Sequence, residues 1–173
     1  DDSVTKLRRL QNNINHRLST SSLQPKALGK ALKRADVVIA ALQIGDGKVP
    51  CLVSEEMVSD MKKGAVVVDV SIDQGGCFET SKPTSHSEPT FLVDDVVHYC
   101  VTNMPGAVAR TSTQALENST LPFTLAIANK GYQKALLQDK NLLNGLNIHD
   151  GKITHPEVAK ALDYRFFNPV DFL

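Results

Sequence analysis

Three short apolar runs, each rich in Val and Ile, constrain the fold of this chain more than any other feature of its sequence. They read ADVVIAAL (35–42), AVVVDVSI (65–72) and VVHYCVTN (96–103). Their residues are apolar almost continuously rather than in alternation, which is typical of strands covered on both faces. Successive runs begin about 30 residues apart, the usual length of a strand–helix–strand unit. The runs therefore predict parallel strands in an α/β sheet.

Two helices are predicted around the first of these strands. The segment SEEMVSDMKKG (54–64) begins with Ser54, a favourable N-cap residue, and places Lys62 and Lys63 near the negative end of the helix dipole. The segment PKALGKALKR (25–34) opens with a proline, which suits the first turn of a helix. The order helix, strand, helix, strand predicts the second half of a Rossmann-type, doubly wound parallel sheet.

The rest of the chain departs from this pattern. Residues 73–95 carry two glycines, two prolines and many Ser and Thr, so we expect a loop without structure of its own. A loop of about 20 residues in a compact domain is usually functional. After Pro105 and Gly106 the sequence becomes mainly helical, although Pro122 should kink a helix or start a second one. We expect two domains, residues 1–104 and 105–173.

Composition excludes several classes of function. Nineteen Lys and Arg residues balance nineteen Asp and Glu residues, so no charge excess predicts a nucleic-acid or membrane partner. No apolar run approaches the ~20 residues that cross a bilayer, and the opening residues lack the apolar core of a signal peptide. The three cysteines form neither a disulfide framework nor a metal motif. We expect a cytoplasmic protein with free thiols and no metal, truncated at its N-terminus.

Asp73 is the main candidate for chemistry. In an open parallel sheet, ligands bind at the carboxyl ends of the strands, and Asp73 directly follows the second run. Gly75 and Gly76 beside it let a ligand approach the backbone closely. A carboxylate there can transfer a proton or orient a cation, but an aspartate at such a position can also cap the following turn. The residues alone leave both interpretations open.

Other polar residues favour structural roles. Asp69 lies inside the second run, so if it is buried it needs hydrogen-bond partners and is expected to be structural. His86 and His98 have no metal-binding neighbour at a suitable spacing, which favours loop and strand roles. Lys6 lies on a basic helical segment that, without further context, predicts a solvated face.

Several motifs together resemble one family. KRADVVIAAL (33–42), IDQGGCFETS (72–81) and NMPGAVARTST (103–113) resemble the C-terminal half of bacterial-type NAD-dependent L-alanine dehydrogenases. The resemblance covers nearly the whole chain and is dense from Ala35 to about Gly151. The α subunit of proton-translocating transhydrogenase shares the fold, but its sequence usually has Arg and Gly-Gly-Asn where this chain has DQGGCFE. That subunit, and a non-catalytic homologue, are the alternatives.

The resemblance implies a fold, a reaction and a cofactor. Enzymes of this family convert L-alanine, water and NAD to pyruvate, ammonium and NADH, and they form hexamers. By this resemblance, residues 1–104 are the C-terminal part of an NAD-binding Rossmann domain, and residues 105–173 are helices of the substrate domain. The family's glycine-rich phosphate loop and its substrate-binding Arg, Lys and His precede the position of Asp1. We therefore expect this chain to be inactive alone.

The resemblance also assigns individual residues. Asp73 matches the aspartate that assists catalysis, and Asn103 lies in the loop beside the nicotinamide and is expected to contact the substrate. Asp1 matches the carboxylate that holds the adenosine ribose. Val101 and Met104 also lie in the loop beside the nicotinamide, and simple packing is an equal alternative for these two residues. The expected cofactor-binding residues are Asp1, Lys6, Leu42, Asp73, Val101, Asn103 and Met104. The chain departs from the family in one loop, where it has Gly45, Asp46 and Gly47 and the family commonly has a Pro-Gly pair followed by a small residue.

Overall fold

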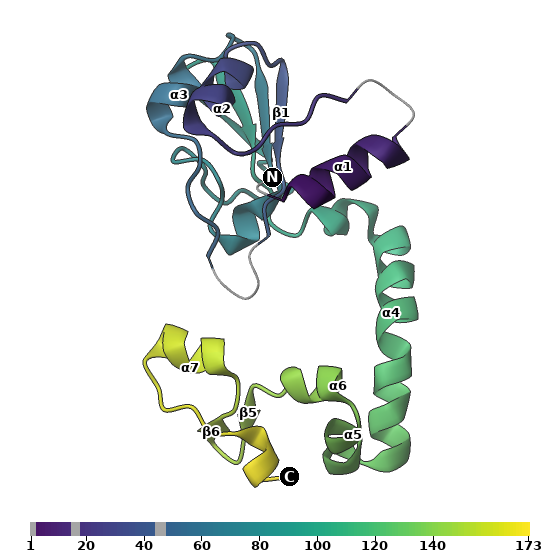
Figure 1. Ribbon diagram of the computed structural model, residues 1–173. Coiled ribbons are helices and arrows are strands. Elements are labelled where there is room, and N and C mark those ends of the chain that lie inside the picture. The colour runs from purple at the N-terminus through teal and green to yellow at the C-terminus, as the bar shows by residue number, and fades with distance from the viewer. Residues whose placement is uncertain (1–2, 15–17, 44–47) are drawn as a thin grey trace. The chain divides into compact units, whose positions relative to one another are not determined.

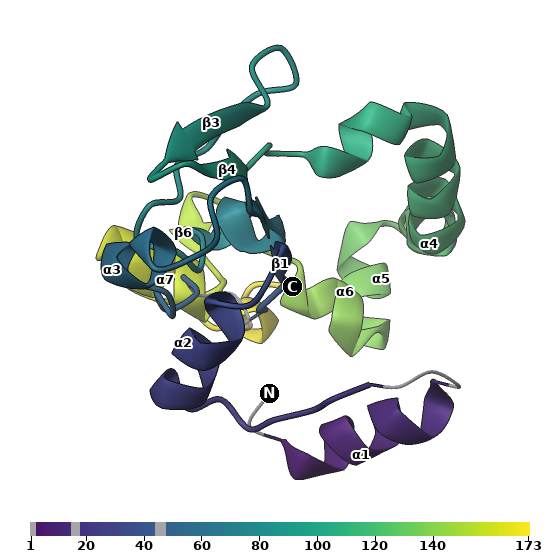
Figure 2. The same ribbon diagram turned by 90° about the horizontal axis from the view of Figure 1, so that it is seen from above.

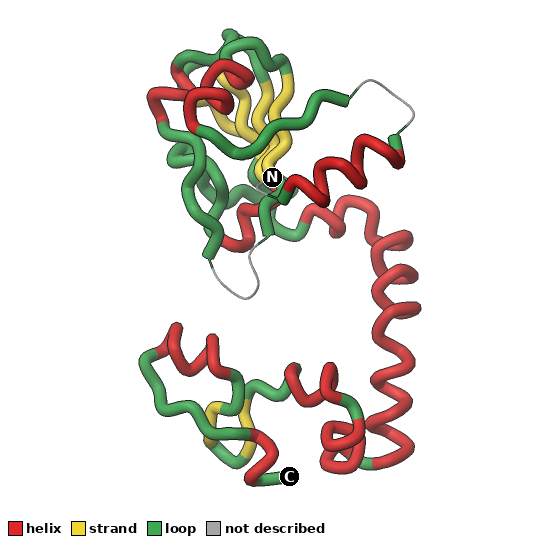
Figure 3. Tube along the Cα trace, in the orientation of Figure 1, coloured by secondary structure: helices red, strands yellow, loops and turns green. Residues whose placement is uncertain are grey.

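The computed structural model describes residues 3–14, 18–43 and 48–173 (Figure 1). The chain divides into two compact units, Asp1–Met104 and Pro105–Leu173. Figure 3 shows that the four-stranded sheet belongs to the first unit and that the second is mainly helical. Whether these units are the NAD-binding and substrate domains of an enzyme stays a prediction.

The sheet of the first unit is mixed, with three parallel strands and one antiparallel edge strand. Its order is β1-β2-β4-β3, and the strands are β1 (Val37–Ala40), β2 (Val66–Asp69), β3 (Thr90–Val93) and β4 (Val96–Tyr99). β2 pairs in parallel with β1 on one side and with β4 on the other. The prediction of a parallel α/β sheet is confirmed, and the strands are shorter than the apolar runs that predicted them.

The prediction that residues 73–95 contain no strand is wrong. Thr90–Val93 forms β3, which pairs antiparallel with β4, as Figure 2 shows from above. The turn between them consists of Asp94 and Asp95, whose φ angles are 49° and 62°. Two consecutive residues with positive φ form the tight turn that best matches the twist of a hairpin, and Asp tolerates this conformation. The Asp-Asp pair between two β-branched runs was the signal for this hairpin.

Two helices cover one face of the sheet. The first unit contains α1 (Val4–Asn13), α2 (Pro25–Leu32) and α3 (Glu55–Ser59), and the last two lie within the segments predicted to be helical. Leu32 of α2 and Val58 of α3 are buried in the same cluster as Val67 and Val96 of the sheet. In Figure 1, α2 and α3 lie beside each other against the strands. Together with loop residues such as Val53 and Phe78, this layer forms the core of the unit.

The other face of the sheet is uncovered by the described residues. Val37, Ile39 and Leu92 are 58%, 66% and 67% exposed, although all three are strand residues. For the described residues of the first unit, the expectation that the strands are covered on both faces is therefore wrong, because the buried cluster lies against the opposite face.

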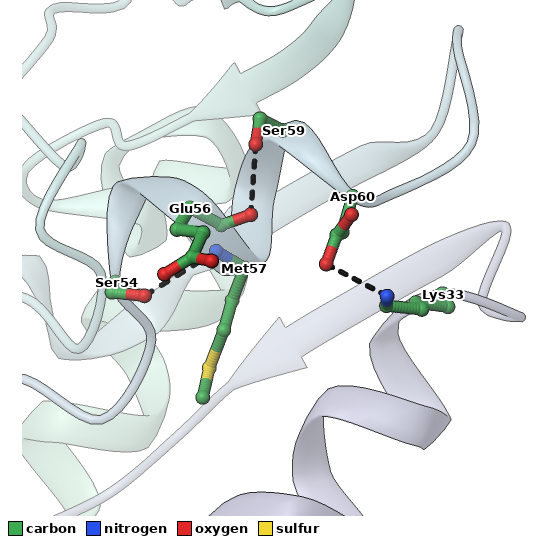
Figure 4. A network of polar contacts seen from close by, with 6 residues as sticks. All are labelled: Lys33, Ser54, Glu56, Met57, Ser59 and Asp60. Carbon is green, nitrogen blue, oxygen red and sulfur yellow. Dashed lines mark hydrogen bonds and ion pairs between the residues drawn. The ribbon is translucent and has the colours of Figure 1, made fainter.

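Polar contacts fix α3 at both ends (Figure 4). Ser54 is the N-cap, and its Oγ accepts a hydrogen bond of 3.3 Å from the backbone N–H of Met57, as predicted. At the other end, the Asp60 carboxylate forms an ion pair of 2.8 Å with Lys33, which follows α2. Because α3 already ends at Ser59, Lys62 and Lys63 are not in its last turn. They form ion pairs with Asp36 and Asp95 instead.

The second unit consists of one long helix and several short elements. They are η2 (Met104–Val108, beginning at the last residue of the first unit), α4 (Ala109–Lys130), α5 (Tyr132–Gln138), α6 (Lys140–Asn144), β5 (Ile148–His149), β6 (Lys152–Ile153), α7 (Pro156–Leu162) and η3 (Pro169–Asp171). Pro122 lies inside α4, so it does not start a second helix. None of the helices in the described ranges has both the length and the apolar character that a membrane crossing requires.

His98 is a wholly buried residue on the covered face of the sheet, as its structural interpretation expected. Its ring stacks on Phe91 with 5.0 Å between centroids, and its Nε2 lies 2.8 Å from Thr80 Oγ1. Its Nδ1 lies 3.1 Å from the carbonyl of Val96, so Nδ1 carries the proton and Nε2 accepts from the Thr80 hydroxyl. Burial lowers the pKa of His98, while the Val96 carbonyl and Asp69 oppose that shift.

We predict that replacing Ser54 by Ala lowers the free energy of unfolding by about 1 kcal/mol, because the Met57 N–H loses its acceptor. Urea unfolding followed by circular dichroism measures this change. Ser59→Ala is the matched control, since the Ser59 hydroxyl bonds only the Glu56 carbonyl of its own helix. Equal unfolding midpoints for the two variants would contradict the capping role.

We predict that His98 makes the protein less stable as the pH falls. The unfolded histidine takes up a proton near pH ~6.5, whereas the folded one, with its lowered pKa, takes it up only at lower pH. Its contribution is therefore complete above the unfolded pKa and is lost as the pH falls toward the folded pKa, at up to about 1.4 kcal/mol per pH unit. Urea unfolding between pH 7.5 and pH 5, in steps of about half a unit, measures this slope.

The His98→Phe variant should lose this component of the pH dependence, because Phe retains the stack on Phe91 but binds no proton. His86→Gln is the control, since His86 is exposed and lies in a loop. An unchanged slope in His98→Phe would assign the acid sensitivity to other groups.

Candidate functional site

The candidate site lies at the carboxyl ends of the three parallel strands. Because β1, β2 and β4 are parallel and adjacent, Leu42, Asp73 and Asn103 follow strands that end at the same edge of the sheet. One hydrogen bond ties the first two segments together, from Ser71 Oγ to the carbonyl of Leu42 at 2.7 Å. The described structure thus brings the predicted strand-end segments to one edge.

Asp73 presents a free carboxylate at this edge. It lies in the 3-10 turn η1 (Val70–Gln74) and is exposed. Its side chain forms no hydrogen bond or ion pair with any described residue. The side chain that caps η1 is Asp69, which accepts a hydrogen bond from the Ser71 N–H. The alternative that Asp73 caps the turn is therefore wrong, and its carboxylate remains available for a ligand.

Two glycines shape the chain directly after Asp73. Gly75 and Gly76 have φ angles of 103° and 80°, in the left-handed region that other residues rarely adopt. A Cβ on Gly76 would lie 2.9 Å from Asp69 Oδ2 and 2.9 Å from Ser81 Cβ. A Cβ on Gly75 would lie 2.7 Å from Lys48 Cε, because the alkyl chain of Lys48 crosses this glycine. Gly76 is therefore required for space and for backbone conformation, whereas Gly75 is required for its backbone conformation, since the Lys48 side chain can move.

The third strand end is held by an added segment from the loop after Asp73. Thr84 forms a parallel bridge with Val101, and the ring of His86 lies with Nε2 3.0 Å from the carbonyl of Asn103. Asn103 is exposed and has a φ angle of 55°, so its side chain projects from a left-handed turn. No local pattern indicates that His86 contacts Asn103, since 17 residues separate them.

The predicted cofactor-binding residues differ in accessibility. Leu42 and Met104 are half-buried, whereas Val101 is wholly buried, which leaves packing as the role that the structure shows for Val101. Lys6 is exposed on α1, and its ammonium has no partner among the described residues. Asp1 and the loop at residues 45–47 lie outside the described residues.

Asp69 is the buried charge behind the site. It is 0% exposed, and its carboxylate accepts from the backbone N–H of Ser71 at 3.1 Å and of Cys77 at 2.8 Å, and from Ser81 Oγ at 2.6 Å. The prediction that a buried Asp69 would be structural and hydrogen-bonded is confirmed. The sequence signal was a carboxylate inside an otherwise apolar run, although the run does not indicate which donors surround it.

A pocket of about 650 Å³ opens beside Gly75 and Gly76. Its lining includes Lys48, Glu79 and Ser81. Glu79 accepts a hydrogen bond of 2.9 Å from the N–H of Glu55 at the start of α3, so this carboxylate serves the helix. Sequence analysis did not single out Lys48, whose alkyl chain covers Gly75 and so places a cation beside the turn that carries Asp73.

A family model described as "Alanine dehydrogenase/PNT, C-terminal domain" matches residues 1–156. The chain belongs to this family. It is 53% identical to the alanine dehydrogenase of Halomonas elongata over 166 residues, and 49% identical to that of Mycolicibacterium smegmatis over 173 residues. These alignments cover 96% and 100% of this chain but 45% and 47% of the relatives. The chain thus spans about half the length of the curated relatives it matches.

Solved structures agree with the family assignment. A structure described as L-alanine dehydrogenase superposes with a TM-score of 0.86 at 42% identity, covering 94% of this chain and 45% of the other. This confirms the predicted α/β fold and the resemblance to alanine dehydrogenases. A transhydrogenase from Sinorhizobium meliloti superposes with a TM-score of 0.61 at 22% identity, which shows a shared fold alone.

The strand-end residues of this alanine dehydrogenase family member combine polar and apolar side chains. An exposed carboxylate at Asp73, an exposed amide at Asn103 and half-buried apolar side chains at Leu42 and Met104 meet the needs of a flat, polar-edged ring. These side chains could therefore contact a ring with polar edges.

We predict that Gly76→Ala lowers the free energy of unfolding by at least about 2 kcal/mol, because the added Cβ meets Asp69 and Ser81 and the backbone is left-handed. Gly29→Ala is the matched control. Gly29 lies inside α2 with no atom within 4 Å of its Cβ position, so alanine there should be neutral or stabilise by up to about 1 kcal/mol. Urea unfolding midpoints of both variants measure the contrast. Tolerance of alanine at position 76 would show that the turn is not tightly packed.

Proposed function

We propose that this chain is the C-terminal half of an NAD-dependent L-alanine dehydrogenase. The observation that carries the proposal is the free, exposed carboxylate of Asp73 at the ligand-binding edge of a parallel sheet. Because the chain is 53% identical to an alanine dehydrogenase, we assign this carboxylate to the oxidation of L-alanine. The substrates would be L-alanine, water and NAD, and the products pyruvate, ammonium, NADH and one proton.

In this proposal Asp73 handles protons beside the reacting carbon. Oxidation of alanine removes a hydride from Cα and a proton from the amine, and water then adds to the resulting imine before ammonium leaves. Bound NAD supplies the hydride acceptor. A carboxylate without internal partners can accept the amine or water proton and can stabilise the cationic imine. The exposure of Asp73 supports this role, because a capped carboxylate would lose a contact on reacting.

The neighbouring residues would position the reactants. The Asn103 amide has both donor and acceptor groups, so it can orient the substrate carboxylate or the nicotinamide amide. Leu42 and Met104 would offer apolar contact to the cofactor, with Val101 packed behind them. Asp1 and Lys6 would contact the adenosine ribose side, an assignment that rests on family motifs alone.

The remaining parts of the site would come from the half of the relatives that this chain does not span. Hence we propose that this chain is inactive alone. We also propose a cytoplasmic homohexamer, an assembly supported only by the family resemblance.

We predict that Asp73→Asn, in the full-length protein that carries this chain, lowers turnover of L-alanine by at least about 100-fold. NAD affinity should change by less than about threefold, because an amide retains most of the packing. Initial rates of NADH formation and calorimetric titration with NAD measure the two quantities. Asp36→Asn is the matched control, since Asp36 is exposed and its carboxylate pairs, among the residues that the structure describes, with Lys62 alone.

Two outcomes would contradict the proposal. Undiminished turnover in Asp73→Asn would remove the catalytic role of this residue. If the unmodified full-length protein binds NAD but oxidises no amino acid, it is a non-catalytic homologue. Hydride transfer between two bound nucleotides without alanine would instead make it a transhydrogenase subunit.

A further inference from the structure

We infer that Asp69, rather than the turn sequence alone, positions Asp73 for catalysis, and that Asp69 is therefore a positioning residue of the proposed enzyme. This inference rests on the proposed function of Asp73. Asp69 is the last residue of β2, and only residues 70–72 separate it from Asp73. It lies behind the site and is wholly buried, so it does not itself contact a ligand.

The carboxylate of Asp69 closes the chain around Asp73. One oxygen, Oδ1, accepts from the N–H of Ser71, two residues before Asp73, and the other, Oδ2, accepts from the N–H of Cys77, four residues after it. The segment between these two donors contains the last three residues of the 3-10 turn, Asp73 among them, and both left-handed glycines. A single rigid group thus fixes both ends of the segment that carries the exposed carboxylate.

The charge of Asp69 has no cationic partner among the residues that the structure describes. It is balanced by donors alone, with Ser81 Oγ at 2.6 Å completing the set. Behind this serine, the Cys100 thiol donates to Ser81 Oγ over 3.8 Å, and burial raises the pKa of that thiol, which keeps its proton in place. A buried carboxylate held only by oriented donors loses much of its stability when one donor is displaced. The conformation of the turn is therefore coupled to this charge.

The same group links the turn to its neighbour in the sheet. Ser71, which donates its N–H to Asp69, also donates its hydroxyl to the carbonyl of Leu42 at 2.7 Å. Cys77, the second backbone donor, accepts from the N–H groups of Leu52 and Val53 at 2.8 Å and 3.1 Å. Movement of Asp69 would consequently shift Asp73 relative to the segment after β1, along which the cofactor is proposed to lie.

Asp69→Asn tests this inference because it preserves shape while turning one acceptor atom into a donor. Whichever way the amide points, its NH₂ faces at least one backbone N–H, from Ser71 or Cys77. In the full-length protein we expect turnover to fall on the order of 100-fold, the usual effect of a misplacement near 1 Å. NAD affinity should stay within about threefold. Asp36→Asn is again the surface control.

A double-mutant cycle with Asp73→Asn distinguishes positioning from general destabilisation. If Asp69 acts through Asp73, Asp69→Asn should cost less than about twofold in turnover when Asp73→Asn is already present. A full 100-fold further loss in that background would overturn the inference. Unchanged turnover in the single Asp69→Asn variant of an active enzyme would also overturn it.

Hydrogen exchange provides a readout that does not depend on activity. Amide exchange at residues 75–77 should rise at least about tenfold in Asp69→Asn and remain unchanged in Asp36→Asn. If the unmodified protein oxidises no alanine, the proposed function fails. In that case faster amide exchange in Asp69→Asn still confirms that the Asp69 carboxylate holds the turn, and unchanged exchange refutes it.

If Asp69→Asn yields no folded protein, Ser81→Ala removes one donor only and should lower turnover about tenfold. Ser85→Ala, an exposed serine of the same loop, is its control.

Discussion

The burial of one carboxylate, Asp69, controls how the end of β2 is built. An ionised group without water must be surrounded by donors, and this chain supplies two backbone N–H groups and one hydroxyl. The backbone can offer both N–H groups to one side chain only if it turns tightly and passes through left-handed conformations. Gly75 and Gly76 meet that demand, and Gly76 also leaves room for the carboxylate itself. The exposed Asp73 is carried on the turn that results.

A buried charge at this position also explains why the edge of the sheet can be both rigid and polar. Strand ends are loops, and loops with exposed polar groups are usually mobile. Here the segment after β2 is bonded to the segments after β1 and before α3, while the segment after β4 is bonded to Thr84 and His86. The donors and acceptors for a ligand can therefore be held in place without being consumed by internal contacts, as the free carboxylate of Asp73 illustrates.

Sequence reasoning predicted the features that depend on local patterns. The apolar runs predicted the parallel strands, Ser54 predicted the start of α3, and Asp73 was assigned to the correct edge because strand direction follows from the repeat. It missed β3, whose signal was a short hairpin turn of two aspartates within a Ser- and Pro-rich segment. It also could not identify the partners of Asp69 or the contact of His86 with Asn103, since those depend on tertiary packing across 8 to 17 residues. Whether Asp73 caps or stays free was a question about side-chain contacts, which only coordinates answer.

The error about the two faces of the sheet follows from the same logic. The register aligns Val37 with Val66, Val66 with Val97, and Val97 with Leu92, so these residues form one row on one face. A row of Val and Leu residues of this kind is typical of strands covered on both faces, yet Val37 and Leu92 are more than half exposed here. The matched relatives are about twice as long as this chain. The strand sequence is therefore typical of a sheet buried on two faces, whereas the described residues cover one face. An exposed apolar row favours packing against a second layer.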